Sequence, residues 1–182
     1  MEYLEEVHLS LEHIVNCCAI TLRTEIAVFD NHAKLVCCSP TYLKKKGKVV
    51  HAPSINEVIE CGSVLVNKPG EMISCIGCRF KDNCPSTVEI LSCVRLMGEI
   101  IGVIAITSFT KEGHNRICAN LQTYQDAISE LSFLVGQVVL NKTGNAESQN
   151  TERLVGGVMN ISASPLLLTD SNGVITQYNA IA

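Results

Sequence analysis

The stretch TVEILSCVRLMGEIIGVIAIT, residues 87–107, sets the architecture of the chain. Its first half, residues 87–96, is rich in β-branched and apolar residues and alternates in polarity as a strand does. Gly98 and Glu99 then turn the chain, and residues 100–107 are almost entirely apolar. A short apolar run of this kind is typical of a central strand that is covered on both faces. We therefore expect a strand pair at the middle of a sheet.

Segments upstream of this pair predict a helix and a hairpin. Apolar residues recur every three or four positions from Leu4 to Cys18, which indicates an amphipathic helix. Residues 25–29 and 34–38 flank a polar turn and predict two antiparallel strands. The mixed segment that follows contains a short expected helix over residues 55–61, with Ser54 as its cap.

The most regular apolar repeat of the chain lies downstream of the strand pair and predicts a long helix. Its members step by four and three positions through three heptads. Two interpretations stay open, because a helix that lies on the sheet shows the same pattern as one that also forms a dimer contact with the first helix. The seam residues are Ile117, Leu121, Tyr124, Ile128, Leu131, Val135 and Val138.

The last part of the chain changes character. Residues 141–150 are polar and predict a linker. Residues 165–169 and 173–178 predict a second hairpin around a turn rich in polar residues. A lone hairpin cannot bury its apolar face, so we expect residues 151–182 to begin a second domain or to pack on the first.

Composition excludes several classes of function. The chain has 182 residues and a net charge of −4, so it lacks the basic field that direct nucleic-acid binding needs. Its one basic run, residues 44–48, is interpreted as a solvated loop. No apolar segment approaches the roughly 18 residues of a membrane span, and the acidic N-terminus lacks a signal-peptide core. We expect a cytoplasmic protein that does not engage a membrane.

Ten cysteines in such a protein are expected to serve metal or redox chemistry, because the cytosol keeps thiols reduced. Three of them crowd into SCIGCRFKDNCP, residues 74–85. The two-residue gap between Cys75 and Cys78 lets both sulfurs face one centre, and Cys84 returns after a short loop. The fourth ligand position is then open to Cys61, Cys93 or His51, or a cluster iron keeps it free for an exogenous ligand.

The spacing of these cysteines fits more than one chemistry. We place an iron–sulfur cluster first, which would make the loop a sensor of oxygen, nitric oxide or redox state. Thiols that hold no metal, either reduced or redox-switching, remain an alternative, and so does a structural zinc ion. No nucleophile–base pair stands out elsewhere, and no G-x-x-x-x-G-K-[S/T] phosphate loop occurs, so we do not expect an enzyme.

Two stretches resemble known families. Residues 88–106 are similar to the signature of GAF-type sensory domains, in which a strand and a turn precede an "I-G-V-I-A-I" strand. Residues 168–179 resemble the opening of a PAS domain, where "D-x-x-G-x-I" precedes an asparagine. Together they resemble the sensory region of sigma-54-dependent enhancer-binding transcriptional activators. Clostridial members of that group carry a similar "C-x-x-C" with a third cysteine before the strand pair.

The resemblance implies an α+β fold with a GAF/PAS-like antiparallel sheet between N- and C-terminal helices. It implies a GAF-like domain over residues 1–140, a linker over 141–150 and the start of a PAS domain over 151–182. It further implies a homodimer through the first and last GAF helices and a small effector. The full-length activator is expected to engage DNA and sigma-54 RNA polymerase. The alternative function is a receptor for a small metabolite such as an amino acid, with structural or metal-free cysteines.

Overall fold

The structure is a computed structural model that describes residues 3–48, 52–143, 159, 164–169 and 172–182. Helices and strands follow one another in the order expected for an α+β fold. Their bounds are η1 (Glu5–Val7), α1 (His8–Leu22), β1 (Glu25–Asp30), β2 (Leu35–Cys38), α2 (Pro40–Lys46), α3 (Ala52–Cys61), β3 (Ser63–Val66), η2 (Ile73–Cys75), β4 (Val88–Leu96), β5 (Glu99–Ser108), α4 (Lys111–Ala119), α5 (Leu121–Thr143), β6 (Leu167–Thr169) and β7 (Ile175–Tyr178).

The sheet has five strands in the order β2-β1-β5-β4-β3, and every neighbouring pair is antiparallel. The expected strand pair therefore forms, and β5 lies at the centre as its apolar sequence predicted. The turn between β4 and β5 contains Met97 and Gly98, both with positive φ. The prediction of an antiparallel sheet flanked by N- and C-terminal helices is confirmed.

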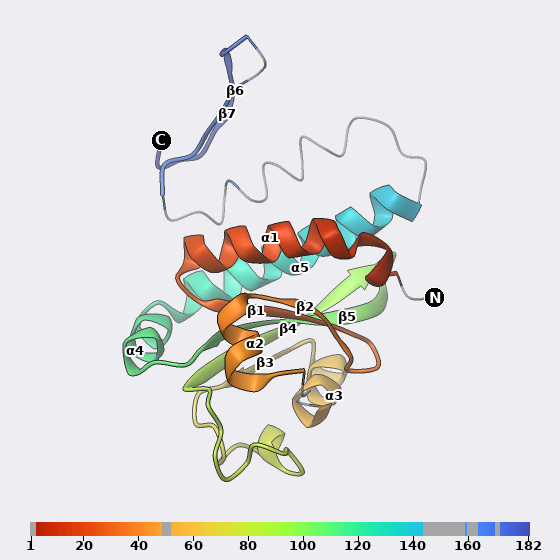
Figure 1. The fold of residues 1–182 in the computed structure, drawn as a ribbon, viewed down its shortest axis with the longest axis vertical. Coiled ribbons are helices and arrows are strands. Elements are labelled where there is room, and N and C mark those ends of the chain that lie inside the picture. Colours follow the sequence, from red (N-terminus) through yellow and green to blue (C-terminus); the bar gives the residue numbers. More distant parts are fainter. Residues whose placement is uncertain (1–2, 49–51, 144–158, 160–163, 170–171) are drawn as a thin grey trace.

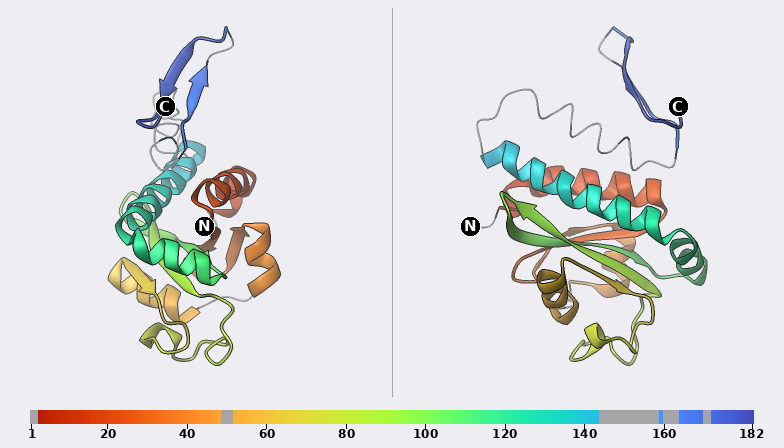
Figure 2. Two further views of the ribbon diagram at one scale, coloured as in Figure 1. Left: turned by 90° about the vertical axis from the view of Figure 1, so that its left-hand side faces the viewer. Right: turned by 180° about the vertical axis from the view of Figure 1, so that it is seen from behind.

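Helices cover both faces of the sheet, as Figures 1 and 2 show. Helices α1 and α5 pack on one face, whereas α2 and α3 lie on the other. Successive residues of each strand point to opposite faces, so Ile104 and Ile106 face α5 while Val103 and Ala105 face α2 and α3. The sheet thus separates two cores, which explains why its middle strands are apolar on both sides.

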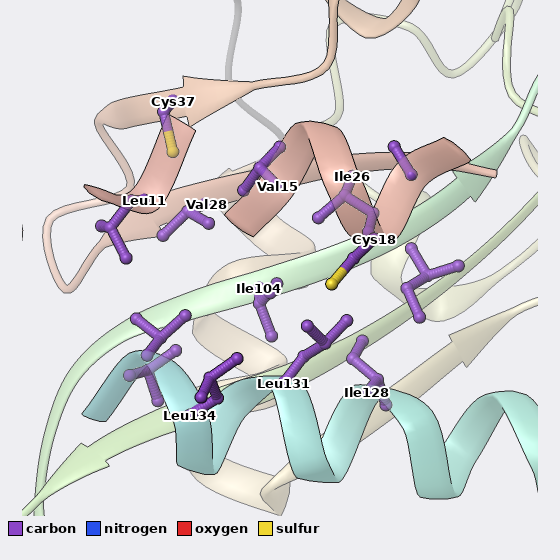
Figure 3. Packing of buried hydrophobic residues seen from close by; sticks show 14 of the residues in the cluster. Leu11, Val15, Cys18, Ile26, Val28, Cys37, Ile104, Ile128, Leu131 and Leu134 are labelled. Atoms are coloured by element: carbon purple, nitrogen blue, oxygen red, sulfur yellow. The ribbon is translucent and has the colours of Figure 1, made fainter. Parts of the chain in front are cut away.

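The larger core lies between α1, α5 and the sheet. Figure 3 shows Ile128 and Leu131 of α5 turned toward Ile104 of β5, with Cys18 of α1 beside them. Helix α5 approaches β4 closely at Gly136, where an added Cβ would lie 2.4 Å from the carbonyl oxygen of Arg95. Only glycine allows this approach without displacing the helix or the strand.

The predicted seven-residue seam is divided between two helices, so the expectation of one continuous helix is wrong at its start. Ile117 belongs to α4, and the chain leaves helical geometry at Asn120 before α5 begins. The side chains of Tyr124, Ile128, Leu131 and Val135 are buried in the core of this chain. The remaining two, Leu121 and Val138, are partly buried against the same core. The seam therefore packs on the sheet, and its dimer role is not tested by this arrangement.

The second hairpin forms as predicted, with β6 and β7 antiparallel. Its exit is held by the buried amide of Asn179. The Nδ2 group of Asn179 donates to the carbonyl oxygens of Met159 at 3.2 Å and Ser164 at 2.9 Å. Its Oδ1 accepts from the backbone N–H groups of Leu166 and Ala182, each at 3.1 Å.

Most of the predicted linker, residues 144–150, lies outside the described residues, and so does most of the N-terminal part of the predicted second domain. Helix α5 continues through Thr143 and so occupies the first three positions of that linker. None of the helices in the described part of the chain combines the length and the apolar character that crossing a bilayer requires.

Candidate functional site

The cysteine motif forms a loop, residues 70–86, on the face of the sheet that carries α2 and α3 (Figure 1, yellow-green). Cys75 ends the short helix η2, and its side chain is buried in the smaller core. Cys78 and Cys84 are half-buried. All ten cysteines of the chain lie in the described ranges, and all ten are free thiols.

Two of the loop sulfurs accept hydrogen bonds from backbone N–H groups. The N–H of Gly70 donates to Cys75 Sγ at 3.1 Å, and the N–H of Phe80 donates to Cys78 Sγ at 3.2 Å. Bonds of this kind stabilise sulfur that carries negative charge. The backbone thus holds both sulfurs in fixed positions within the loop.

The start of the loop lies close to Lys81 in its second half. Gly70 has φ +92°, and a Cβ on it would lie 2.6 Å from the carbonyl oxygen of Lys81. At the next bend, Gly77 has φ +75°, which L side chains rarely adopt. A hydrogen bond from Ser54 Oγ of α3 to the carbonyl oxygen of Ser74, at 3.2 Å, fastens the loop to the helix beside it.

Electrostatics show which groups share the interior of the loop. Burial raises the pKa of the Cys78 thiol, and the Phe80 N–H opposes this increase. The charges of Cys84 and Cys75 raise the pKa of Cys78 further, whereas the ammonium group of Lys46 lowers it. The charges of Cys75, Cys84 and Lys46 therefore all act on the thiol of Cys78.

Lys46 is the residue that the sequence reasoning missed. It ends α2, and its Nζ forms an ion pair with Glu89 Oε1 of β4, with side chains only 1% and 3% exposed. The same carboxylate oxygen accepts a hydrogen bond from Ser86 Oγ at 2.8 Å. Thr107 lies directly across from Glu89 in the β4–β5 register and bonds to it at 3.5 Å.

Aromatic rings enclose the ammonium group. Lys46 Nζ lies 5.6 Å from the ring centre of Tyr42 and 5.9 Å from that of Phe80. Tyr42 in turn packs edge-on against Phe29 and tilted against Phe109. Burial, followed by the charges of Glu89, Cys38 and Cys84, raises the pKa of Tyr42 well above its usual value. Tyr42 therefore stays neutral and serves as packing around the ion pair.

The interpretation of residues 44–48 as a solvated loop is wrong for its middle. Residues 40–46 form a helix, and Lys46 lies four positions after buried Tyr42, on the same face. Its neighbours Lys44 and Lys45 are exposed, as the composition argument expected. The spacing from Tyr42 to Lys46 was the available clue, but a run of lysines conceals it.

The proposed fourth ligands lie in different surroundings. Cys61 is exposed at the end of α3. Cys93 is buried on β4, where its Sγ donates to the carbonyl oxygen of Val58 at 3.1 Å. Burial raises the pKa of Cys93, and Arg95 opposes this. His51 lies outside the described residues.

The chemistry of the loop side chains favours metal binding, but their arrangement does not. Three thiols, two of which accept backbone N–H hydrogen bonds, suit a soft metal. However, within the described ranges no group of three or more His, Cys, Asp or Glu side chains is placed to hold a metal ion. Ligation by Cys75, Cys78 and Cys84 would therefore require the loop to rearrange, and the metal prediction stays a prediction.

The chain was compared with known proteins. No protein-family model matches it, and no curated protein does. Among solved structures, one match is the cofactor-binding GAF domain of the nutrient sensor CodY from Clostridium difficile. The two are 6% identical, the TM-score is 0.45, and the match covers 69% of this chain and 81% of that chain. The site is accordingly assigned from its own geometry.

Proposed function

We propose that this chain is a regulatory sensory module whose input site is the loop of residues 70–86. One observation carries the proposal: Lys46 lies beside Phe80 of this loop, its charge lowers the pKa of Cys78, and it is paired with Glu89 near the start of β4. A change of charge at the thiols must therefore alter the balance of a buried ion pair in the sheet.

A path for the signal leads from this pair to the C-terminal helix. Glu89 belongs to β4, which also contains Arg95. The carbonyl oxygen of Arg95 lies against Gly136 of α5, and no side chain separates the two backbones there. A shift of β4 is thus passed directly to α5, which runs on toward the rest of the chain.

Two kinds of input chemistry suit the loop. The first is an iron–sulfur cluster or another thiolate-bound metal at Cys75, Cys78 and Cys84, with Cys61 or Cys93 as a further ligand. When bound, a cluster would supply sensitivity to oxygen, nitric oxide or redox state. The second is oxidation of the thiols themselves without a metal. Zinc would make the loop structural instead.

Strictly anaerobic purification followed by iron, sulfide and zinc analysis distinguishes these inputs. Iron and sulfide in equal amounts, with visible absorbance, are expected for the cluster. Cys78→Ala should abolish both, whereas Cys17→Ala, at an exposed cysteine on α1, should change neither. Colourless protein without iron contradicts the cluster. Disulfide mapping after mild oxidation then tests whether Cys78 pairs with Cys84 or Cys75.

The second candidate is a receptor for a small metabolite, and the ion pair favours it. An amino acid carries a carboxylate and an ammonium group, the same charges that Glu89 and Lys46 present to each other. The carboxylate of such a ligand would bind Lys46 and its ammonium group would bind Glu89, in place of the ion pair between these residues. Aromatic rings already lie beside Lys46. Calorimetric titration with single amino acids tests this function. Absence of heat for all of them, with folded protein, rejects it.

The setting that we propose for the module follows from the sequence resemblance. It is the cytoplasmic input region of a sigma-54-dependent activator, with a PAS domain beginning in residues 151–182. The module works as a homodimer through the outer faces of α1 and α5. Exposed apolar side chains on those faces support this partner: Leu9 at 75%, Ile20 at 78% and Phe133 at 52% exposure.

A further inference from the structure

An exposed thiol lies away from the cysteine loop, on helix α4. Cys118 is exposed, and its Sγ lies 3.6 Å from Nε2 of His114, one helical turn earlier. The other ring nitrogen of His114, Nδ1, lies 2.8 Å from the carbonyl oxygen of Thr87. The carbonyl, the imidazole and the thiol therefore form one hydrogen-bonded series.

This hydrogen-bonded series fixes the tautomer of the imidazole. A carbonyl oxygen only accepts hydrogen bonds, so Nδ1 must carry the proton of that bond. In the neutral ring Nε2 then has a free lone pair, and this lone pair faces the thiol of Cys118. A nucleophile, a base within reach and a third group that orients the base are the parts of an activated cysteine.

The protein contains a second histidine–cysteine pair that serves as a control for this geometry. Cys17 of α1 is also exposed and also follows a histidine, His13, by four residues. Within the described part of the molecule, His13 and Cys17 share no hydrogen bond, and no carbonyl orients the His13 ring. The spacing is the same in both pairs, so the anchor on Thr87 is what sets His114 and Cys118 apart.

We propose that Cys118 is a modification site that His114 activates toward low-molecular-weight disulfides. The Sγ proton passes to Nε2 of His114 as Sγ attacks one sulfur of the disulfide. A new bond forms between Cys118 Sγ and that sulfur while the bond between the two reagent sulfurs breaks. The leaving thiolate takes the proton from His114, so Cys118 is oxidised to a mixed disulfide and half of the reagent is reduced to a thiol.

The location gives the modification a route to the rest of the fold. Thr87, which holds His114, precedes β4 and follows Ser86, whose hydroxyl bonds to Glu89. The Thr87 side chain also donates to the carbonyl oxygens of Ser108 and Thr110, each at 3.0 Å. A group added to Cys118 is therefore attached beside the imidazole that ties α4 to the start of β4.

The test is a time course with 2-hydroxyethyl disulfide on the fully reduced 182-residue chain, with each cysteine quantified by peptide mass spectrometry. Cys118 should be modified about tenfold faster than Cys17, a modest part of what a positioned base contributes. In His114→Asn the rate at Cys118 should fall to that of Cys17. Asparagine is chosen because its Nδ2 keeps the donor that anchors to the Thr87 carbonyl.

The matched control is His13→Asn, which should leave the rate at Cys17 unchanged. Equal rates at Cys118 and Cys17 in the native chain would overturn the proposal, and so would an unchanged rate at Cys118 in His114→Asn. If His114→Asn shifts the melting temperature, His114→Gln provides the second variant. Its side-chain amide also lacks a basic nitrogen, so Cys118 must slow in it as well.

Discussion

Lys46 and Glu89 form an ion pair in which the two side chains are 1% and 3% exposed, although they lie on different elements, α2 and β4. The pair lies between the cysteine loop and the centre of the sheet, with Ser86 and Thr107 bonded to the same carboxylate oxygen. Taking two charges out of water is costly, so removal of either partner leaves the other charge buried without a counter-charge.

We predict that Lys46→Met lowers the free energy of unfolding by about 3–5 kcal/mol, because it leaves the carboxylate of Glu89 buried without its cation. The double variant Lys46→Met/Glu89→Leu should recover a large part of this loss. Urea denaturation of both variants measures the effect. Lys45→Met is the matched control, since Lys45 is the exposed neighbour, and it should change stability little. Equal effects at positions 45 and 46 would contradict the buried pair.

Replacing the glycine that begins the cysteine loop should open it. Gly70→Ala introduces a methyl group 2.6 Å from the Lys81 carbonyl oxygen at φ +92°, so the loop must shift. The thiol of Cys75, which is buried in the native fold, should then react with a thiol reagent faster than in the native chain. Gly62→Ala is the control: φ there is +88° but no atom lies within 4 Å of the added group. It should leave the rate at Cys75 unchanged.

The outer faces of α1 and α5 should determine the oligomeric state without affecting the core. Phe133→Glu changes an exposed side chain, so the monomer should stay folded while the dimer dissociates, as light scattering would show. Leu131→Ala, two residues earlier, should instead lower stability by about 2–5 kcal/mol because Leu131 is fully buried. Phe133→Glu protein that remains dimeric and folded would exclude this face as the interface.

Stability should fall above about pH 9 because of two buried thiols. Burial raises the pKa of the Cys18 thiol from 9.0 to about 12, and the charge of Cys17 adds to this increase. Burial, followed by the charge of Cys38, raises the pKa of the Cys37 thiol from 9.0 to about 12 as well. The unfolded chain then releases protons that the folded chain keeps, so stability is unaffected below pH 9 and is lost progressively toward pH 12. Each thiol contributes a slope of up to about 1.4 kcal/mol per pH unit.

Urea denaturation between pH 8 and pH 10.5 checks this slope. Lysines and tyrosines also titrate there, so the measured quantity is the difference between the native chain and Cys18→Ala/Cys37→Ala. The double variant should lose stability less steeply. Cys61→Ala, at an exposed thiol, should retain the native slope, and parallel slopes for all three proteins would refute the assignment.

The sheet was predictable because its signals are local. The apolar run of β5, the turn at Gly98 and the hairpin of β1 and β2 each follow from neighbouring residues, and the structure contains all three. The break at Asn120 was not predictable in this way. Ile117 continues the four-and-three repeat of α5, yet it packs in the core from a separate helix.

The candidate site was predictable only in part. The cysteine motif drew attention by its composition, but its partner Lys46 lies 43 positions from Glu89 and enters through tertiary packing. A lysine in a basic run is ordinarily solvated, and only the burial of Tyr42 one turn earlier distinguishes Lys46. Likewise, the role of His114 depends on the carbonyl of Thr87, which no side-chain pattern reveals.

The order of the sheet has a consequence for the nascent chain. Strand β1 pairs with β2 on one side, but its other neighbour is β5, where Ala27 pairs with Ala105. Contacts of such long range form late, because the intervening chain must close a large loop first. During synthesis the cysteines of residues 75–84 therefore leave the ribosome before the sheet that shelters them exists. The thiols of this loop are consequently most accessible to reagents in the interval before β5 has been made.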